Sequence, residues 1–153
     1  MKSQKLILQV AKGYVLLSAV SVLAVSVMAF QSPQAVMDLV SVKLTTNDAF
    51  SSIRGVYGGV GVTLFIALIY TLRKNISESL GLLVTLWGLY AASRLLTIFS
   101  EGPLGNFGNK WLAIEVTFCF IAVILLVSTR RIQAKSIAEK RIAHSRKSIQ
   151  EGL

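Results

Sequence analysis

Residues 80–99, LGLLVTLWGLYAASRLLTIF, and residues 111–127, WLAIEVTFCFIAVILLV, decide the fold of this chain. Each stretch is long enough to cross a membrane, because a helix of about 17–25 mainly apolar residues spans the apolar core. Each is interrupted by one ionisable residue, Arg94 in the first and Glu115 in the second. An ionisable residue within a span is costly and normally faces other helices, so the two stretches predict helices packed together in a membrane.

Two further apolar runs lie upstream, and hydrophobic residues make up 54% of the 153 residues. That share is high for an ordinary soluble domain of this length. We therefore predict an all-α, integral membrane four-helix bundle in residues 1–129, followed by a basic, helical cytoplasmic tail in residues 130–153. The expected spans are residues 13–30, 53–72, 80–99 and 111–127.

The positions of the basic residues predict the orientation. Lysine and arginine gather on the cytoplasmic side of membrane proteins. Eleven of the 16 basic residues would lie on one side, and these are Lys2, Lys5, Arg73, Lys74, Arg130, Arg131, Lys135, Lys140, Arg141, Arg146 and Lys147. The other side has Lys43 and Lys110, with Arg54 at its edge. We expect a multi-pass protein of the cell inner (plasma) membrane with both termini cytoplasmic, and the net charge of +9 to serve anchoring rather than nucleic-acid binding.

An alternative interpretation of the first span is a cleaved signal peptide. It has a basic start, an apolar middle and the small-residue stretch Val27-Met28-Ala29. Cleavage would leave three spans. The apolar run is longer than that of a usual signal peptide, which favours a retained span.

The connections carry local signals of their own. Pro33 can start a helix, and Val36, Leu39 and Val40 recur at helical spacing, which predicts a short helix on the outer surface. Thr46 or Asn47 is expected to cap the second span. At the other end of the chain, the helix of the fourth span is expected to continue past Thr129 into the tail.

A polar cluster is expected in the outer half of the bundle. Arg94 and Glu115 lie at matching depths on consecutive antiparallel helices, so they are expected to pair. Helical periodicity places other polar residues on the same faces. The expected cluster is Arg54, Tyr57, Tyr90, Arg94 and Glu115.

The cluster has two possible roles. Its formal charge is +1, so it can bind a lipid or small amphiphile with an anionic head, the tail lying along Phe65, Leu83 and Trp87. Alternatively, it is a salt bridge with hydrogen bonds that fixes helix register. A different class of function is an oligomeric transporter or proton-conducting protein that uses Arg94 and Glu115.

Glycines in the second span predict close helix packing. Gly55 and Gly59 have the small-xxx-small spacing, and Gly58 and Gly61 lie beside them. Packing within the bundle and a homodimer interface are both compatible with this pattern.

The residue types that carry most catalysis are scarce. Cys119 is the single cysteine and His144 the single histidine, so neither an intramolecular disulfide nor a metal site of several such ligands is expected. We expect no catalytic residues, no metal and no cofactor, and the sequence does not favour an enzyme.

Several of these residues resemble the motifs of a known family. The stretches are Arg54-Gly55-Val56-Tyr57-Gly58-Gly59, Ser93-Arg94-Leu95-Leu96-Thr97 and Glu101-Gly102-Pro103, together with Glu115. They resemble the bacterial membrane proteins classified as domain of unknown function 4345, over about residues 50–127. Ser93, Thr97 and Glu101 replace the glycine, serine and aspartate of the family pattern. The resemblance implies an inner-membrane protein of four helices, loosely similar to DoxX-like bundles, and supplies no activity.

Overall fold

The computed structural model describes residues 2–151, apart from the side chains of residue 140 and residues 144–151, and this part of the chain is helical with short connections. The helices are α1 (Lys2–Gln31), α2 (Pro33–Asp38), α3 (Asn47–Ile53), the π-helix η1 (Arg54–Gly59), α4 (Val60–Lys74), α5 (Ile76–Ser100) and α6 (Asn106–Glu151). The elements α3, η1 and α4 follow one another without a break and form one long helix, Asn47–Lys74. With α1, α5 and α6 it makes four helices that are long and apolar enough to cross a membrane. The prediction of an all-α chain with four such helices is confirmed.

Side-chain caps explain where several helices begin. Thr46 caps α3, its hydroxyl accepting a hydrogen bond from the backbone N–H of Ala49 at 3.2 Å, as predicted. Asn75 follows the end of α4 and caps α5, its side-chain oxygen accepting a hydrogen bond from the backbone N–H of Ser77 at 3.1 Å. The chain therefore reverses direction at this one residue. The predicted short helix at Pro33 is also present, as α2. These ends follow from short-range chemistry that the sequence displays.

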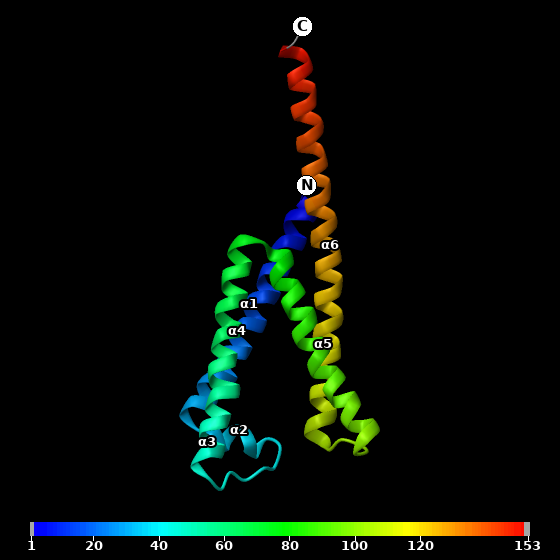
Figure 1. Cartoon of the computed structure of the whole chain (residues 1–153). Coiled ribbons are helices and arrows are strands. Elements are labelled where there is room, and N and C mark those ends of the chain that lie inside the picture. The colour runs from blue at the N-terminus through cyan, green and yellow to red at the C-terminus, as the bar shows by residue number, and fades with distance from the viewer. Residues whose placement is uncertain (1, 152–153) are drawn as a thin grey trace.

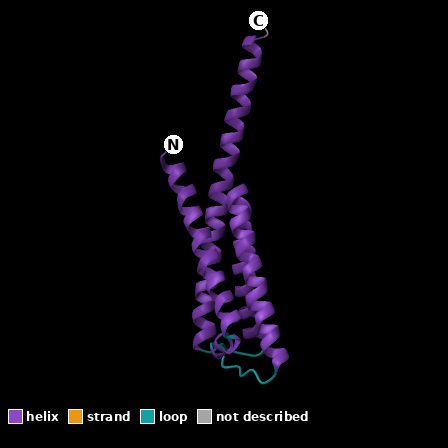
Figure 2. Cartoon of the chain, turned by 90° about the vertical axis from the view of Figure 1, so that its left-hand side faces the viewer, coloured by secondary structure: helices purple, strands orange, loops and turns teal. Residues whose placement is uncertain are grey.

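The long helices form two antiparallel pairs. One pair is α1 with α4 and η1, and the other is α5 with α6. The turn at Asn75 joins the pairs at one end, and Figure 1 shows them diverging toward the opposite end, where α2 and α3 lie. The first and last helices extend from the joined end in both views (Figures 1 and 2). We call this end the closed end and the opposite one the open end.

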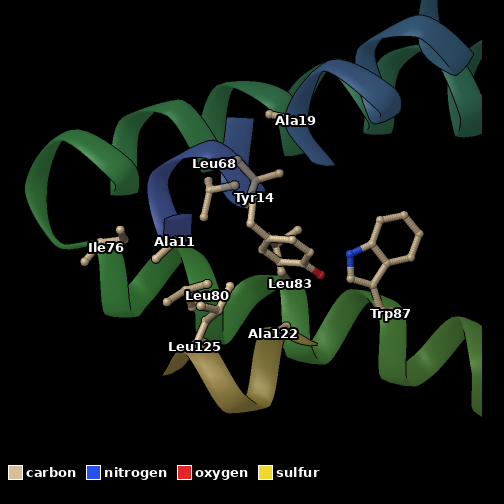
Figure 3. Close-up of a cluster of buried hydrophobic side chains, with 11 residues drawn as sticks. Ala11, Tyr14, Ala19, Leu68, Ile76, Leu80, Leu83, Trp87, Ala122 and Leu125 are labelled. Atoms are coloured by element: carbon tan, nitrogen blue, oxygen red, sulfur yellow. The ribbon is translucent and has the colours of Figure 1, made fainter. Parts of the chain in front are cut away.

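The main hydrophobic core lies toward the closed end, where all four long helices contribute side chains (Figure 3). It consists of Ala11, Tyr14, Val15, Ala19, Leu68, Ile76, Leu80, Leu83, Trp87, Ala122 and Leu125. A smaller cluster of Ala29, Val36 and Met37 holds α2 against the end of α1. The core therefore joins the two helix pairs at one end only.

The fourth long helix continues into the tail without interruption, as predicted. Gln133 fixes the first turns of the tail against the start of α5. The Ser77 hydroxyl donates to Gln133 Oε1 at 2.8 Å, and Gln133 Nε2 donates to Asn75 Oδ1 at 3.1 Å. Beyond this contact α6 projects past the other helices (Figures 1 and 2). The side chains of Lys140, Arg146, Lys147 and His144 lie outside the described residues.

Candidate functional site

The centre of the candidate site is an ion pair between α5 and α6. Arg94 Nε donates to Glu115 Oε2 at 2.7 Å and Arg94 Nη2 donates to Glu115 Oε1 at 2.9 Å. The Glu115 side chain is 3% exposed and that of Arg94 is 22% exposed. Such a two-pronged arrangement is the strong geometry for an arginine and a carboxylate. The pair is formally neutral and fixes the register of the two helices.

The loop that brings these residues together is short. Residues 101–105 connect α5 to α6, and Gly102 has a φ of +103°, a conformation that residues with a side chain rarely adopt. The chain therefore reverses tightly, which places Arg94 beside Glu115.

Two of the expected residues are tyrosines. Tyr90 belongs to α5, one helical turn before Arg94, and Tyr57 belongs to η1 in the other helix pair. Tyr57 is 36% exposed and Tyr90 is 45% exposed. Of the five expected cluster residues, Arg94 and Glu115 are in direct contact, and no described hydrogen bond joins either tyrosine to them. We call Tyr57, Tyr90, Arg94 and Glu115 the tyrosine–arginine group.

The fifth residue, Arg54, has a different environment. Its Nε donates to the carbonyl oxygen of Phe30 at 3.2 Å, so it caps the last turn of α1. With Asn47, Phe50 and Ser51 it lines an open hollow of about 430 Å³. Within the described part of the chain it forms no hydrogen bond or ion pair with the tyrosine–arginine group.

The π-helix accounts for the bond that Arg54 makes to the end of α1. A regular helix has 3.6 residues per turn, whereas i→i+5 bonding places more residues in each turn. The π-helix covers Arg54 to Gly59, so the assumed face breaks within this stretch. Free carbonyl groups at the end of α1 then offer the guanidinium a nearby acceptor.

The expected path for an amphiphile tail is also corrected. Leu83 is fully buried and Trp87 nearly so, both within the main core. Trp87 packs edge-on against Phe118 of α6, with ring centroids 5.2 Å apart. The protein's own side chains therefore occupy the space that a tail along Leu83 and Trp87 would need.

The four glycines of the second span divide into two sets. A Cβ atom at Gly58 would lie 3.0 Å from the Phe30 ring, and one at Gly61 would collide with the Ser26 hydroxyl. These two glycines permit the close contact of α1 with η1 and α4. By contrast, Gly55 and Gly59 have no described atom within 4 Å of an added Cβ, so neither makes a close helix contact within the described chain.

A second polar group, on α1, was not expected. The Tyr14 hydroxyl donates to the carbonyl oxygen of Phe118 at 2.7 Å and links α1 to α6. Ser18, one helical turn further on, is fully buried. The four-residue spacing of Tyr14 and Ser18 within an apolar run indicates that they share one face of the helix. Neither residue is charged, so the sequence does not mark them as costly to place in a membrane.

The chemistry available at the tyrosine–arginine group is hydrogen bonding. It contains two hydroxyl groups and a paired guanidinium. Among the residues that the structure describes, no three of His, Cys, Asp or Glu lie close enough together to hold a metal ion. The group can thus recognise polar atoms of a bound molecule.

Comparison with known proteins identifies the family. The domain of unknown function DUF4345 matches residues 10–126. The matched region contains most of α1 as well as the motifs from residue 54 onward, so it is longer than the motifs alone indicated. No curated protein and no solved structure gives a significant match. With about three quarters of its length matched, this chain belongs to the DUF4345 family.

Proposed function

We propose that this is a multi-pass protein of the bacterial inner membrane, with both ends in the cytoplasm, that binds an amphiphile with an anionic head between its two helix pairs. The observation that carries the proposal is the partial exposure of Tyr57, Tyr90 and Arg94 within helices that are long enough to span a membrane. Polar groups facing hydrocarbon are unfavourable, and a bound polar head would satisfy them.

The outward faces of the helices support membrane insertion. Large apolar side chains project away from the core, with Phe99 85% exposed, and Leu89, Leu96 and Phe120 also strongly exposed. Soluble proteins rarely leave such an extended apolar surface uncovered. Lipid is therefore the solvent that fits this surface.

The cytoplasmic assignment of the closed end rests on charge. Lys2, Lys5, Arg73 and Lys74 belong to this end, together with the described basic residues of the tail. α1 contributes Tyr14, Val15 and Ala19 to the main core and lies largely inside the family domain, which favours its retention over cleavage as a signal peptide.

Orientation is tested with single cysteines in a Cys119→Ser background. We expect a membrane-impermeant maleimide to label Val42→Cys on spheroplasts, because Val42 is exposed in the connection at the open end. Ala134→Cys, which is exposed on the tail, should be labelled only after the membrane is permeabilised. Labelling of Ala134→Cys on intact spheroplasts would reverse the assignment. The intact mass of the purified protein checks whether α1 is retained.

The preference for an anionic head follows from the unused donors. Arg94 uses Nε and Nη2 on Glu115, and Nη1 has no hydrogen-bond acceptor in the described residues. The hydroxyl groups of Tyr57 and Tyr90 supply further donors from opposite helix pairs. Arg54, which also belongs to the open end and has no carboxylate partner among the described side chains, adds long-range attraction for an anion.

Binding is tested with dodecyl phosphate as the probe, in native mass spectrometry of the protein purified in a neutral detergent. We expect one molecule to bind the wild type. The double variant Tyr57→Phe/Tyr90→Phe should bind it about tenfold or more weakly, because a hydrogen bond to a charged group contributes about 1.5–3 kcal/mol. These substitutions leave the Arg94–Glu115 pair in place, so the fold is retained.

The matched control is Tyr70→Phe. Tyr70 is an exposed tyrosine of α4 near the closed end, and its ring contacts Lys74 instead of the tyrosine–arginine group. Its replacement should leave dodecyl phosphate binding unchanged. Equal binding by the double variant and the wild type, or equally tight binding of uncharged dodecanol, contradicts the proposal.

A further inference from the structure

The hollow at the open end lies along one face of the helix that runs from α3 into η1. Its volume is about 430 Å³, and its lining residues are Asn47, Phe50, Ser51 and Arg54. Residues at this spacing share one face of a helix. The side chains of Asn47 and Ser51 form no hydrogen bond with any residue that the structure describes. The hollow therefore offers unused polar groups to a molecule that fills it.

Arg54 gives the hollow its charge. Its Nε donates to the Phe30 carbonyl oxygen at 3.2 Å, which holds the guanidinium in place, while Nη1 and Nη2 have no acceptor among the described residues. Asp48 is the acidic residue of α3, and it does not line the hollow. A held guanidinium with two free nitrogens has the geometry for binding two oxygens of a phosphate or carboxylate group.

The length of the helix sets the depth of the hollow in a membrane. Asn47–Lys74 has 28 residues and is therefore about 42 Å long, close to the 40–45 Å of a bilayer with its headgroup regions. Asn47, at the open end (Figure 1), then lies among the headgroups. Arg54 follows about 10 Å further along the axis, and helical side chains lean toward the N-terminus of their own helix. Its guanidinium thus reaches back toward the level of lipid phosphates.

We propose that the hollow binds a phosphate ester that carries hydroxyl groups, of which phosphoglycerol is the simplest. The phosphate oxygens accept hydrogen bonds from the two free nitrogens of Arg54. The hydroxyl groups bond to Asn47 and Ser51, whose amide and hydroxyl groups both donate and accept. Phe50 supplies an apolar contact for the glycerol carbons. Two sources provide this chemistry, the headgroup of a lipid at the open end or a soluble glycerol phosphate.

This site differs from the tyrosine–arginine group, with which Arg54 forms no hydrogen bond in the described part of the chain. It rests on the proposed membrane insertion but not on amphiphile binding between the helix pairs. Dodecyl phosphate has no hydroxyl groups for Asn47 and Ser51. It therefore fills the hollow only at concentrations above those at which it binds the tyrosine–arginine group.

The test uses the full-length protein in a neutral detergent, with dihexanoyl phosphatidylglycerol as the probe and native mass spectrometry as the readout. The background is Tyr57→Phe/Tyr90→Phe, which removes the tyrosine donors of the other site. Arg54→Gln should weaken binding about tenfold or more, because it removes a charged donor, and Ser51→Ala about threefold. Circular dichroism checks that each variant keeps its helical fold.

The controls separate the hollow from general attraction to the surface. Lys43→Gln removes the same charge at the open end, since Lys43 is exposed in the connection before α3 and does not line the hollow. Ser52→Ala changes the exposed serine beside Ser51, which also lies outside the lining. Both should leave binding unchanged. Dihexanoyl phosphatidylcholine, which has the same chains and phosphate but no headgroup hydroxyls, should bind about tenfold more weakly than the phosphatidylglycerol.

Glycerol phosphate distinguishes the two sources. Binding about tenfold or more weaker than that of the lipid identifies a lipid headgroup, and binding of equal strength identifies a soluble phosphate ester. The proposal is overturned by the absence of saturable binding of either probe, by equal effects of Arg54→Gln and Lys43→Gln, or by equal binding of the two lipids. None of these results depends on Tyr57 or Tyr90, so this proposal and amphiphile binding between the helix pairs fail independently.

Discussion

Arg94→Ala is expected to lower the free energy of unfolding by about 3–5 kcal/mol, which is the usual effect of removing one partner of a buried ion pair. The large effect comes from Glu115, whose side chain is 3% exposed and would be left as a carboxylate without a counter-charge. The measurement is an SDS titration of the purified protein in mixed micelles, followed by circular dichroism.

The control for Arg94 is Arg54→Ala. Arg54 is exposed and would lose a single hydrogen bond to the Phe30 carbonyl, so we expect a loss of only about 0.5–1.5 kcal/mol. The double variant Arg94→Leu/Glu115→Leu should recover most of the lost stability, because it leaves no buried charge. An Arg94→Ala effect as small as that of Arg54→Ala would contradict the buried pair.

Gly61→Leu should separate α1 from α4 and lower the free energy of unfolding by about 1–3 kcal/mol or more, the range for overfilling a packed interface. A Cβ atom at this position already collides with the Ser26 hydroxyl and comes within 3.2 Å of the Ser26 Cβ. Ser26 is fully buried, so the clash cannot be relieved by turning its side chain toward solvent. The same SDS titration measures the loss.

Gly59→Leu is the matched variant for Gly61, two residues away on the same continuous helix. A Cβ at Gly59 meets no described atom within 4 Å, so we expect a change close to zero or a small gain, since leucine favours a helix over glycine. Equal destabilisation by Gly59→Leu and Gly61→Leu would place the α1–α4 contact elsewhere.

The two helix pairs are thus held together in different ways. In the α1–α4 pair, Gly58 and Gly61 let the backbone of one helix approach side chains of the other. In the α5–α6 pair, the Arg94–Glu115 ion pair fixes the register near the open end. The pairs share the main core only toward the closed end, and their backbones diverge toward the open end.

Much of the architecture is determined by the sequence alone. Four apolar runs of the required length predict the four long helices, and Thr46 and Pro33 mark two helix starts. The contact between Arg94 and Glu115 also follows from sequence, because matching depth on consecutive antiparallel helices leaves few other partners for either charge. These features depend on local periodicity, caps and the high cost of burying an ion.

Only the tertiary structure decided how the faces of different helices meet. In the second span, Arg54 donates to the end of α1, and Gly58 and Gly61 lie against α1, whereas Gly55 and Gly59 have no described atom within 4 Å of an added Cβ. Likewise, Tyr14 and Trp87 lie in different helices, and no pattern along the chain shows that the indole nitrogen faces the tyrosine oxygen (Figure 3). Periodicity assigns a residue to one side of its own helix, whereas the rotation of that helix against its neighbours depends on the packing of all of them together.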